Sequence, residues 1–187
     1  MKSLFNESTV DAWISGLGSA VGALLAGIFT GLVAIYVMTR QIKAEQEKSQ
    51  KDALDSFSKS KKLLLLYANK IYKAGEIVVQ PMKESNSSRE IQESHRIHEE
   101  NIIFITSVYE DMISYKKIIE EIDSYTIYEE VFDTYLEIKM EVESILYYTN
   151  RFLYHNAQVI SPLENSLEKL SINIKKFNTF TLEKSRY

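Results

Sequence analysis

The chain has 187 residues, with 22 Lys or Arg against 26 Asp or Glu and a net charge of −4. It contains no cysteine, which excludes disulfides, thiolate metal sites and cysteine nucleophiles. Only two prolines, Pro81 and Pro162, and six glycines occur, and five of the glycines lie before residue 32. A chain so poor in turn residues is predicted to form long helices.

Residues 1–11 carry Lys2, Glu7 and Asp11 and precede a long apolar stretch. These residues make a poor start for a signal peptide, and the apolar run that follows is too long for the hydrophobic region of one. We therefore interpret residues 1–11 as a short extracytoplasmic N-terminus in front of an uncleaved anchor.

Residues 12–39 read AWISGLGSAVGALLAGIFTGLVAIYVMT and include no charged side chain. About 20 apolar residues suffice for a helix to cross a hydrocarbon core of about 30 Å. Lipid offers no partner for backbone polar groups, so a lone span must be helical. The sequence predicts one transmembrane helix over 12–39, with Trp13 and Tyr36 placed near its two ends as interfacial anchors.

Small residues recur at every fourth position of this span, in two adjacent rows. One row is Ser15, Ser19, Ala23, Gly27 and Gly31, and the other is Gly18, Gly22, Ala26, Thr30 and Ala34. Small residues let helix backbones approach closely in a membrane, as in the GxxxG pattern of Gly18-xxx-Gly22 and Gly27-xxx-Gly31.

Two such rows indicate two contact faces, which a ring of more than two helices requires. One broad face in a homodimer, or simple tolerance of glycine in lipid, explains the rows equally well. We predict a homo-oligomer, a tetramer or higher order rather than a dimer. The predicted packing or pore-lining residues are Ser15, Gly18, Ser19, Gly22, Ala23, Gly27, Thr30 and Gly31.

The segment that follows the span is basic. Residues 38–80 contain nine Lys or Arg against five Asp or Glu. The positive-inside rule then places the N-terminus outside and the rest of the chain in the cytoplasm, as a single-pass protein of the cell membrane. Part of this positive charge is also expected to face anionic lipid headgroups.

Residues 40–80 are predicted to continue the membrane helix as a juxtamembrane helix that Pro81 ends. The first half is so polar that it forms either a solvated stalk or one strand of a bundle. The second half carries apolar residues at helical spacing. The predicted inward residues are Leu54, Phe57, Leu64, Ala68 and Ile71, with Leu63, Leu65 and Leu66 widening the stripe.

Three more helices are expected in a cytoplasmic domain over 81–187. The first covers residues 90–123. The second begins at a capping box formed by Thr126 and Glu129, and the third begins at Ser161-Pro162-x-Glu164. The second has sustained heptad spacing and should pack lengthwise against a neighbour. Its predicted inward residues are Tyr128, Val131, Tyr135, Ile138, Val142, Ile145, Thr149 and Phe152, and those of the third are Leu163, Leu167, Leu170, Ile174 and Phe177. The predicted fold is all-α, with a single transmembrane helix continuing into a bundle of about four helices.

Residues 81–187 contain 12 Lys or Arg against 19 Asp or Glu, so general nucleic-acid binding is not expected. A small anionic or nucleotide ligand could still occupy a local basic pocket, with tyrosines stacking on a base. The candidate ligand-binding residues are Arg96, Lys116, Lys117, Arg151, Tyr154 and His155. For His155, a cation near a helix C-terminus is the simpler interpretation.

The remaining chemistry-bearing residues do not form a catalytic motif. His95 and His98 lie about one helical turn apart, which could place both on a metal, but a solvated helix face is the favoured interpretation. The sequence has no nucleophile elbow, phosphate loop or zincin helix. We therefore predict neither an enzyme nor a cofactor or metal site.

A glycine-rich span on a helical domain fits an oligomeric membrane effector or ion channel, in which a signal received by the bundle opens or disrupts the membrane. The order of WISGLGSAVGALLAGIFTG, a basic exit beginning TRQIK and a helical cytoplasmic domain resembles small bacterial anti-phage membrane effectors. In that group, nucleotide-activated proteins permeabilise or depolarise the inner membrane. The resemblance covers the architecture and the first fifty residues, and it implies a role in anti-phage defence.

The alternative function is a membrane-anchored adaptor or scaffold, in which the span serves only as an anchor and the bundle docks a cytoplasmic protein. A large apolar patch exposed on the bundle would favour this alternative.

Overall fold

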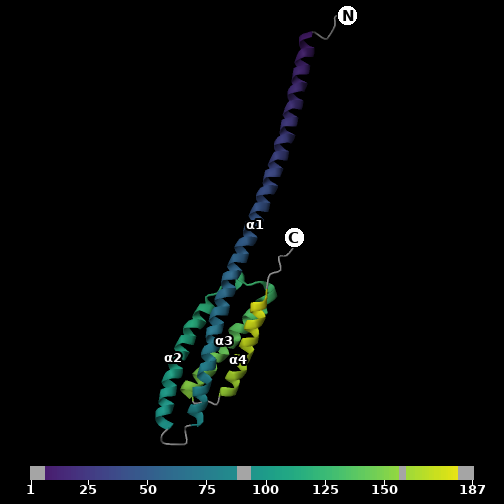
Figure 1. Ribbon diagram of the computed structural model, residues 1–187. Helices are drawn as coiled ribbons and strands as arrows, with labels where there is room; N and C mark the ends of the chain where they lie inside the picture. Colours follow the sequence, from purple (N-terminus) through teal and green to yellow (C-terminus); the bar gives the residue numbers. More distant parts are fainter. Residues whose placement is uncertain (1–6, 88–93, 156–158, 181–187) are drawn as a thin grey trace. The chain divides into compact units, whose positions relative to one another are not determined.

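The computed structural model describes residues 7–87, 94–155 and 159–180. These residues form four α-helices and one short 3-10 helix, and no strand occurs among them (Figure 1). The elements are α1 (Glu7–Ser87), α2 (Ser94–Glu120), η2 (Ser124–Thr126), α3 (Glu129–His155) and α4 (Ile160–Thr179). The predicted all-α fold, with about four helices, is confirmed.

The chain divides into two compact units, residues 1–52 and residues 53–187. The first unit contains the N-terminal part of α1, whose residues 11–52 are all exposed. α1 is the one described helix long and apolar enough to cross a membrane, with an 18-residue window of mean hydropathy 2.2 that is entirely unburied. The division falls at Asp52 and Ala53, so the part of α1 from Ala53 onward belongs to the same unit as the other three helices.

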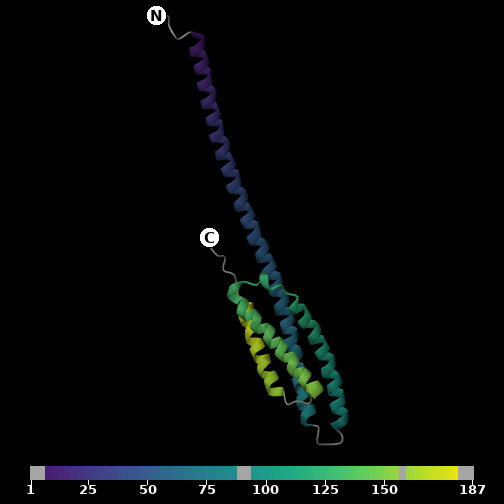
Figure 2. The same ribbon diagram turned by 180° about the vertical axis from the view of Figure 1, so that it is seen from behind.

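The second unit is an up-down-up-down bundle of four helices (Figures 1 and 2). In it, α1 and α3 run in the same direction and occupy diagonally opposite corners. A polar contact joins each pair of neighbouring helices. These contacts are Asn101 to Pro81 (α2–α1, 3.4 Å), Asn150 to Tyr109 (α3–α2, 3.1 Å), Lys169 to Glu141 (α4–α3, 4.0 Å) and Lys83 to Glu164 (α1–α4, 2.7 Å). The cyclic order of the helices is therefore α1, α2, α3, α4.

Heptad seams from all four helices fill the core. The buried residues of α1 follow alternating steps of three and four from Leu64 to Ser85, and α3 shows the same steps from Val131 to Phe152. This spacing keeps one narrow stripe of a helix against its neighbours over many turns. The inward residues predicted for α3 and α4 are buried, apart from the half-buried Tyr128 that precedes α3.

Two predictions about the inner face of α1 were wrong. Leu54 is 45% exposed, and within Leu63–Leu66 only Leu64 is fully buried, with Leu65 half-buried and Leu63 and Leu66 exposed. A heptad seam buries one residue at each step of three or four along the helix. Leu64 occupies such a position, so Leu63 and Leu66 beside it face outward. The apolar stripe of this helix is therefore narrower than its composition indicates.

Pro81 does not end the helix, because α1 continues through it to Ser87. A proline inside a helix removes one backbone hydrogen bond and costs about 3 kcal/mol. Val78 and Met82, on either side of it, are fully buried, so continuing the helix keeps its seam packed against the bundle. Residues 88–93, between α1 and α2, lie outside the described part of the chain.

Both predicted capping motifs were also wrong. Thr126 lies in η2, where its hydroxyl donates to Asp123 O (2.6 Å) and is hydrogen-bonded with the Ser60 hydroxyl (2.7 Å), so it does not cap α3. α4 begins at Ile160, with Val159 as its N-cap, so Ser161 and Pro162 already lie in the first turn. Ile127 and Val159 are buried in the core, and their burial determines where the chain turns into α3 and α4. This is a tertiary effect, which a local sequence motif does not show.

Gly75 allows α1 to approach its neighbours closely. A Cβ atom added there would lie 2.5 Å from Leu167 Cδ2 of α4 and 3.5 Å from Ile145 Cγ2 of α3. A glycine within a helix costs about 1 kcal/mol relative to alanine. At this position the missing side chain provides the space that Leu167 fills.

Candidate functional site

The glycines of the span have no packing partner among residues 7–87, 94–155 and 159–180 of their own chain. A Cβ atom added at Gly16, Gly18, Gly22, Gly27 or Gly31 would meet nothing within 4 Å, in contrast to Gly75. A shallow hollow of about 380 Å³ lies along the same helix, lined by Ala12, Trp13, Gly16, Leu17 and Ala20. The span therefore presents a surface poor in side chains that nothing in the described chain covers.

The two threonine hydroxyls of the span are satisfied inside the helix. Thr30 Oγ1 donates to Ala26 O (2.8 Å), and Thr39 Oγ1 donates to Ile35 O (2.7 Å). Because these donors are already paired, the helix needs no water or polar neighbour at these positions. Ser15, Ser19, Ala23 and the glycines all lie on the exposed surface of this helix, where the sequence analysis placed the packing or pore-lining residues.

The basic candidates for an anionic ligand do not gather in one cavity. Lys116 of α2 is half-buried between Glu120 (3.1 Å) and Glu143 of α3 (3.6 Å), and the hydrogen bond to Glu120 raises the pKa of Lys116. Its charge is thus neutralised by two carboxylates within the bundle. Lys117 is exposed on the next position of α2. Arg96 lies in α2, but its side chain is outside the described residues.

The other three candidates lie near the C-terminal end of α3. Arg151 lies over the ring of Tyr147, 5.8 Å from its centroid, and Tyr154 is 65% exposed. His155 is exposed and occupies the last turn of α3, as its interpretation as a C-terminal cation predicts. Arg151 is eight residues from Glu143, so it lies about 12 Å along α3 from the level of Lys116.

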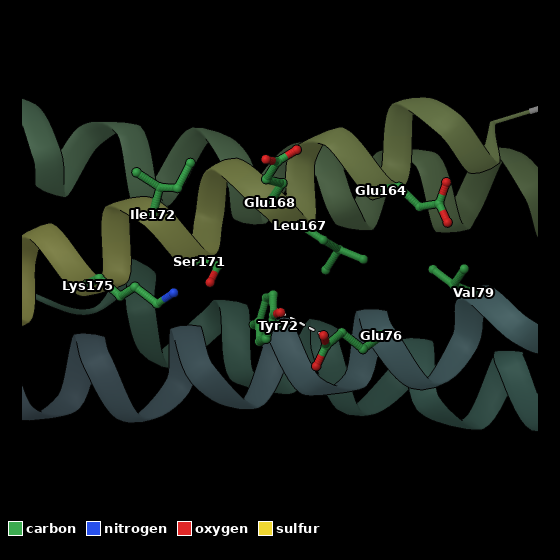
Figure 3. A pocket seen from close by; sticks show the side chains of 9 residues that line it. All are labelled: Tyr72, Glu76, Val79, Glu164, Leu167, Glu168, Ser171, Ile172 and Lys175. Carbon is green, nitrogen blue, oxygen red and sulfur yellow. Dashed lines mark hydrogen bonds between the residues drawn. The ribbon is translucent and has the colours of Figure 1, made fainter.

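A groove of about 520 Å³ separates α1 and α4 (Figure 3). Sequence reasoning missed it, because its two walls are about 90 residues apart in the chain. Its lining residues are Tyr72, Glu76, Val79, Glu164, Leu167, Glu168, Ser171, Ile172 and Lys175. Three carboxylates against one lysine give the groove a charge opposite to the one that a phosphate or nucleotide requires, so the expected anionic ligand does not fit here.

Tyr72 is the residue of the groove with a perturbed acidity. Its hydroxyl donates to Glu76 Oε1 at 2.6 Å, one helical turn away (Figure 3). This hydrogen bond, together with desolvation and the negative charge of Glu76, raises the pKa of Tyr72 above its ordinary value of 10.0, while a hydrogen bond with Ser171 acts in the other direction. The pair at positions i and i+4 was the one part of this groove that the sequence could have indicated.

We expect Tyr72 to ionise late in a spectrophotometric titration at 295 nm. The difference between the wild-type curve and the Tyr72→Phe curve should be a component with a midpoint above pH 10.0, and Glu76→Gln should lower that midpoint. Because the raised pKa belongs to the folded state, its stabilising effect is complete below pH 10 and is lost as the pH rises through the folded pKa. A midpoint at or below 10.0 would contradict the hydrogen-bonded geometry.

The two neighbouring histidines do not form a metal site with other ligands in the described chain. His98 is half-buried in α2 and its Nδ1 has no hydrogen-bond partner, while the side chain of His95 is outside the described residues. Across the residues that were searched, no group of three or more His, Cys, Asp or Glu is placed to hold a metal ion.

The outward side of α3 carries an apolar stripe that sequence analysis did not single out. Leu136 is 41% exposed, Met140 64%, Tyr147 55% and Tyr154 65%. These residues recur at heptad-like spacing, as they do along a coiled-coil seam, but no helix of the described chain covers them. The signal for this stripe was present in the sequence, since it is a second set of apolar positions beside the buried seam.

Comparisons with known proteins add nothing to this geometry: no protein-family model matches the chain, and neither a curated protein nor a solved structure was found that matches it.

Proposed function

We propose that this chain is a homo-oligomeric membrane effector, in which the spans of several copies associate and the helical bundle receives a signal that opens or disrupts the bilayer. One observation carries the proposal. The four helices of the bundle bury their apolar residues against one another. In contrast, no described residue outside the span contacts its glycine-rich surface. Helices in lipid associate through such closely approaching surfaces, so other copies of the span are the natural partner.

The proposed orientation follows from charge. The excess of Lys and Arg in residues 38–80 favours the bundle on the cytoplasmic side, with the N-terminus outside. The resemblance to anti-phage membrane effectors supports the bacterial inner membrane and a defensive role. The span has no ionisable side chain, so a pore would be narrow, lined by Ser15, Ser19 and Thr30, and closed by an apolar constriction that excludes water.

The test is the mass of the purified full-length chain in mild detergent, followed by membrane depolarisation on expression and dye release from vesicles. We expect a tetramer or a larger assembly, together with leakage. A monomer would overturn the proposal, and so would an assembly that leaves membranes intact under every trigger applied, because opening requires a stimulus that distinguishes the closed and open states.

The second candidate is a membrane-anchored adaptor, and the exposed apolar stripe of α3 favours it. Apolar surface left uncovered on a soluble domain marks an interaction site. The same measurements separate the two functions. A dimer without leakage would point to the adaptor, and a tetramer or larger assembly with leakage would point to the effector.

A further inference from the structure

Two outward faces of the bundle combine exposed apolar residues with charge. The α1 outer face consists of Lys59, Lys62, Leu63, Leu66, Lys70 and Ile77, all of them exposed. The α3 outer face consists of Asp133, Leu136, Met140, Glu143, Tyr147 and Tyr154, also exposed. Neither face belongs to the bundle core, and the two helices occupy opposite corners of the bundle (Figures 1 and 2).

The two faces carry opposite charge. Residues 59–75 of α1 contain five lysines and no Asp or Glu. Residues 129–143 of α3 contain six Asp or Glu and a single lysine, Lys139. Lys139 lies over the ring of Tyr135 and Lys70 over the rings of Tyr67 and Tyr115. Such complementary surfaces attract each other and disfavour pairing of either face with itself.

The two faces also match along the bundle axis. A Cβ atom added at Gly75 of α1 would lie 3.5 Å from Ile145 Cγ2 of α3, so these two residues are at about the same level. Phe57 of α1 and Tyr128, the residue before α3, have ring centroids 4.7 Å apart and give nearly the same alignment.

Because α1 and α3 run in the same direction, equal steps along the chain keep residues level. Nine residues before Gly75 and Ile145 are Leu66 and Leu136, and two residues after them are Ile77 and Tyr147. Two apolar residues of one face are thus level with two apolar residues of the other. Lys62 is within one residue of the level of Asp133, and Glu143 is level with Lys73, one turn from Lys70.

We propose that the α1 outer face of one copy packs against the α3 outer face of the next copy. The inference rests on the proposed homo-oligomer and specifies how its bundles meet. In a ring whose axis runs parallel to the bundles, copies are related without a shift along that axis, so residues at the same level face each other. A contact between two different surfaces continues from copy to copy, and it closes into a ring when the rotation allows.

The absence of cysteine from the chain makes the test specific. Full-length Leu66→Cys and Leu136→Cys variants are reconstituted together in vesicles and oxidised. We expect disulfide-linked dimers only when the two variants are mixed, and a ladder of larger products from the double variant. Each variant alone should give none, because Leu66 does not face Leu66 and Leu136 does not face Leu136 of another copy. Both positions are exposed, so the substitutions leave the core unchanged.

A charge exchange provides the second arm. Lys62→Glu should reduce the initial rate of Leu66–Leu136 cross-linking about fivefold, and Asp133→Lys in the neighbouring copy should restore it. Lys176→Glu, at an exposed position of α4 outside both faces, is the matched control and should have no effect.

The outcomes separate this inference from the proposed function. An intact oligomer without Leu66–Leu136 cross-links, or one that cross-links in either single variant alone, would overturn the pairing of faces and leave the function standing. A monomeric protein would overturn both.

Discussion

Phe177→Ala should lower the free energy of unfolding of the bundle by about 3–5 kcal/mol. Phe177 of α4 is 1% exposed and belongs to an aromatic cluster around Phe57 of α1. The ring centroid of Phe57 lies 6.5 Å from that of Phe177, 4.7 Å from that of Tyr128 and 6.0 Å from that of Phe180. Truncation would leave a cavity where α1 and α4 meet, in addition to removing the apolar area of the ring.

The measurement is denaturant unfolding of the full chain in detergent, followed by near-ultraviolet circular dichroism, which reports on aromatic packing in the bundle. Ile172→Ala is the matched control, because Ile172 lies on the same helix and is 55% exposed. Its loss should stay within about 0.5 kcal/mol. Similar losses for the two variants would show that the end of the bundle is not packed as described.

The double variant Gly22→Leu, Gly27→Leu should convert the proposed oligomer to monomers and abolish membrane leakage. Nothing in the chain contacts either glycine, so the bulk of two leucines costs the isolated helix nothing. In an assembly, the same side chains would separate helix backbones that must approach closely. The effect should therefore appear in the mass of the particle and in dye release, and not in helix content.

Leu24→Ile serves as the control for this variant, since it keeps the volume of a bulky residue in the same part of the span. Oligomer mass and leakage should match the wild type. If the double glycine variant also retained its mass, the glycines would be tolerated in lipid and would not be contact residues.

Sequence reasoning predicted the bundle helices well wherever the signal was a long heptad repeat. In α3, Val131, Ile138, Val142 and Ile145 were predicted to face inward and all are buried. A repeat sustained over many turns leaves one arrangement that buries the whole set, so this prediction does not depend on which helix lies opposite. The inward residues of α4 were predicted for the same reason.

Local signals failed where tertiary packing opposed them. Pro81 is a strong helix-breaking signal, yet burial of Val78 and Met82 keeps α1 helical on both sides of it. Thr126 matched a capping box, but its hydroxyl bonds Ser60 of α1, 66 positions away in the chain. A motif of four residues contributes about 1 kcal/mol, which the packing of several core side chains exceeds.

The candidate site shows the same division. The surface of the span that is poor in side chains could be predicted from the sequence, because spacing along a single helix determines which residues share a face. The α1–α4 groove could not be predicted, because its carboxylates come from two helices that are distant in the sequence. In the sequence Lys116 was a candidate cation for an anionic ligand, but in the structure it forms an ion pair with Glu143 of the neighbouring helix.

The sequence by itself determined the existence of a charge-free apolar helix, the all-α class and the faces that each helix buries, because periodicity and composition are properties of one segment. Only the tertiary structure decided which helices are neighbours, where α1 ends, and which leucines of its apolar stripe are exposed. It also decided that the outer faces of α1 and α3 carry apolar residues at matching levels. Those features depend on the register between helices, which long-range packing sets and which no single segment encodes.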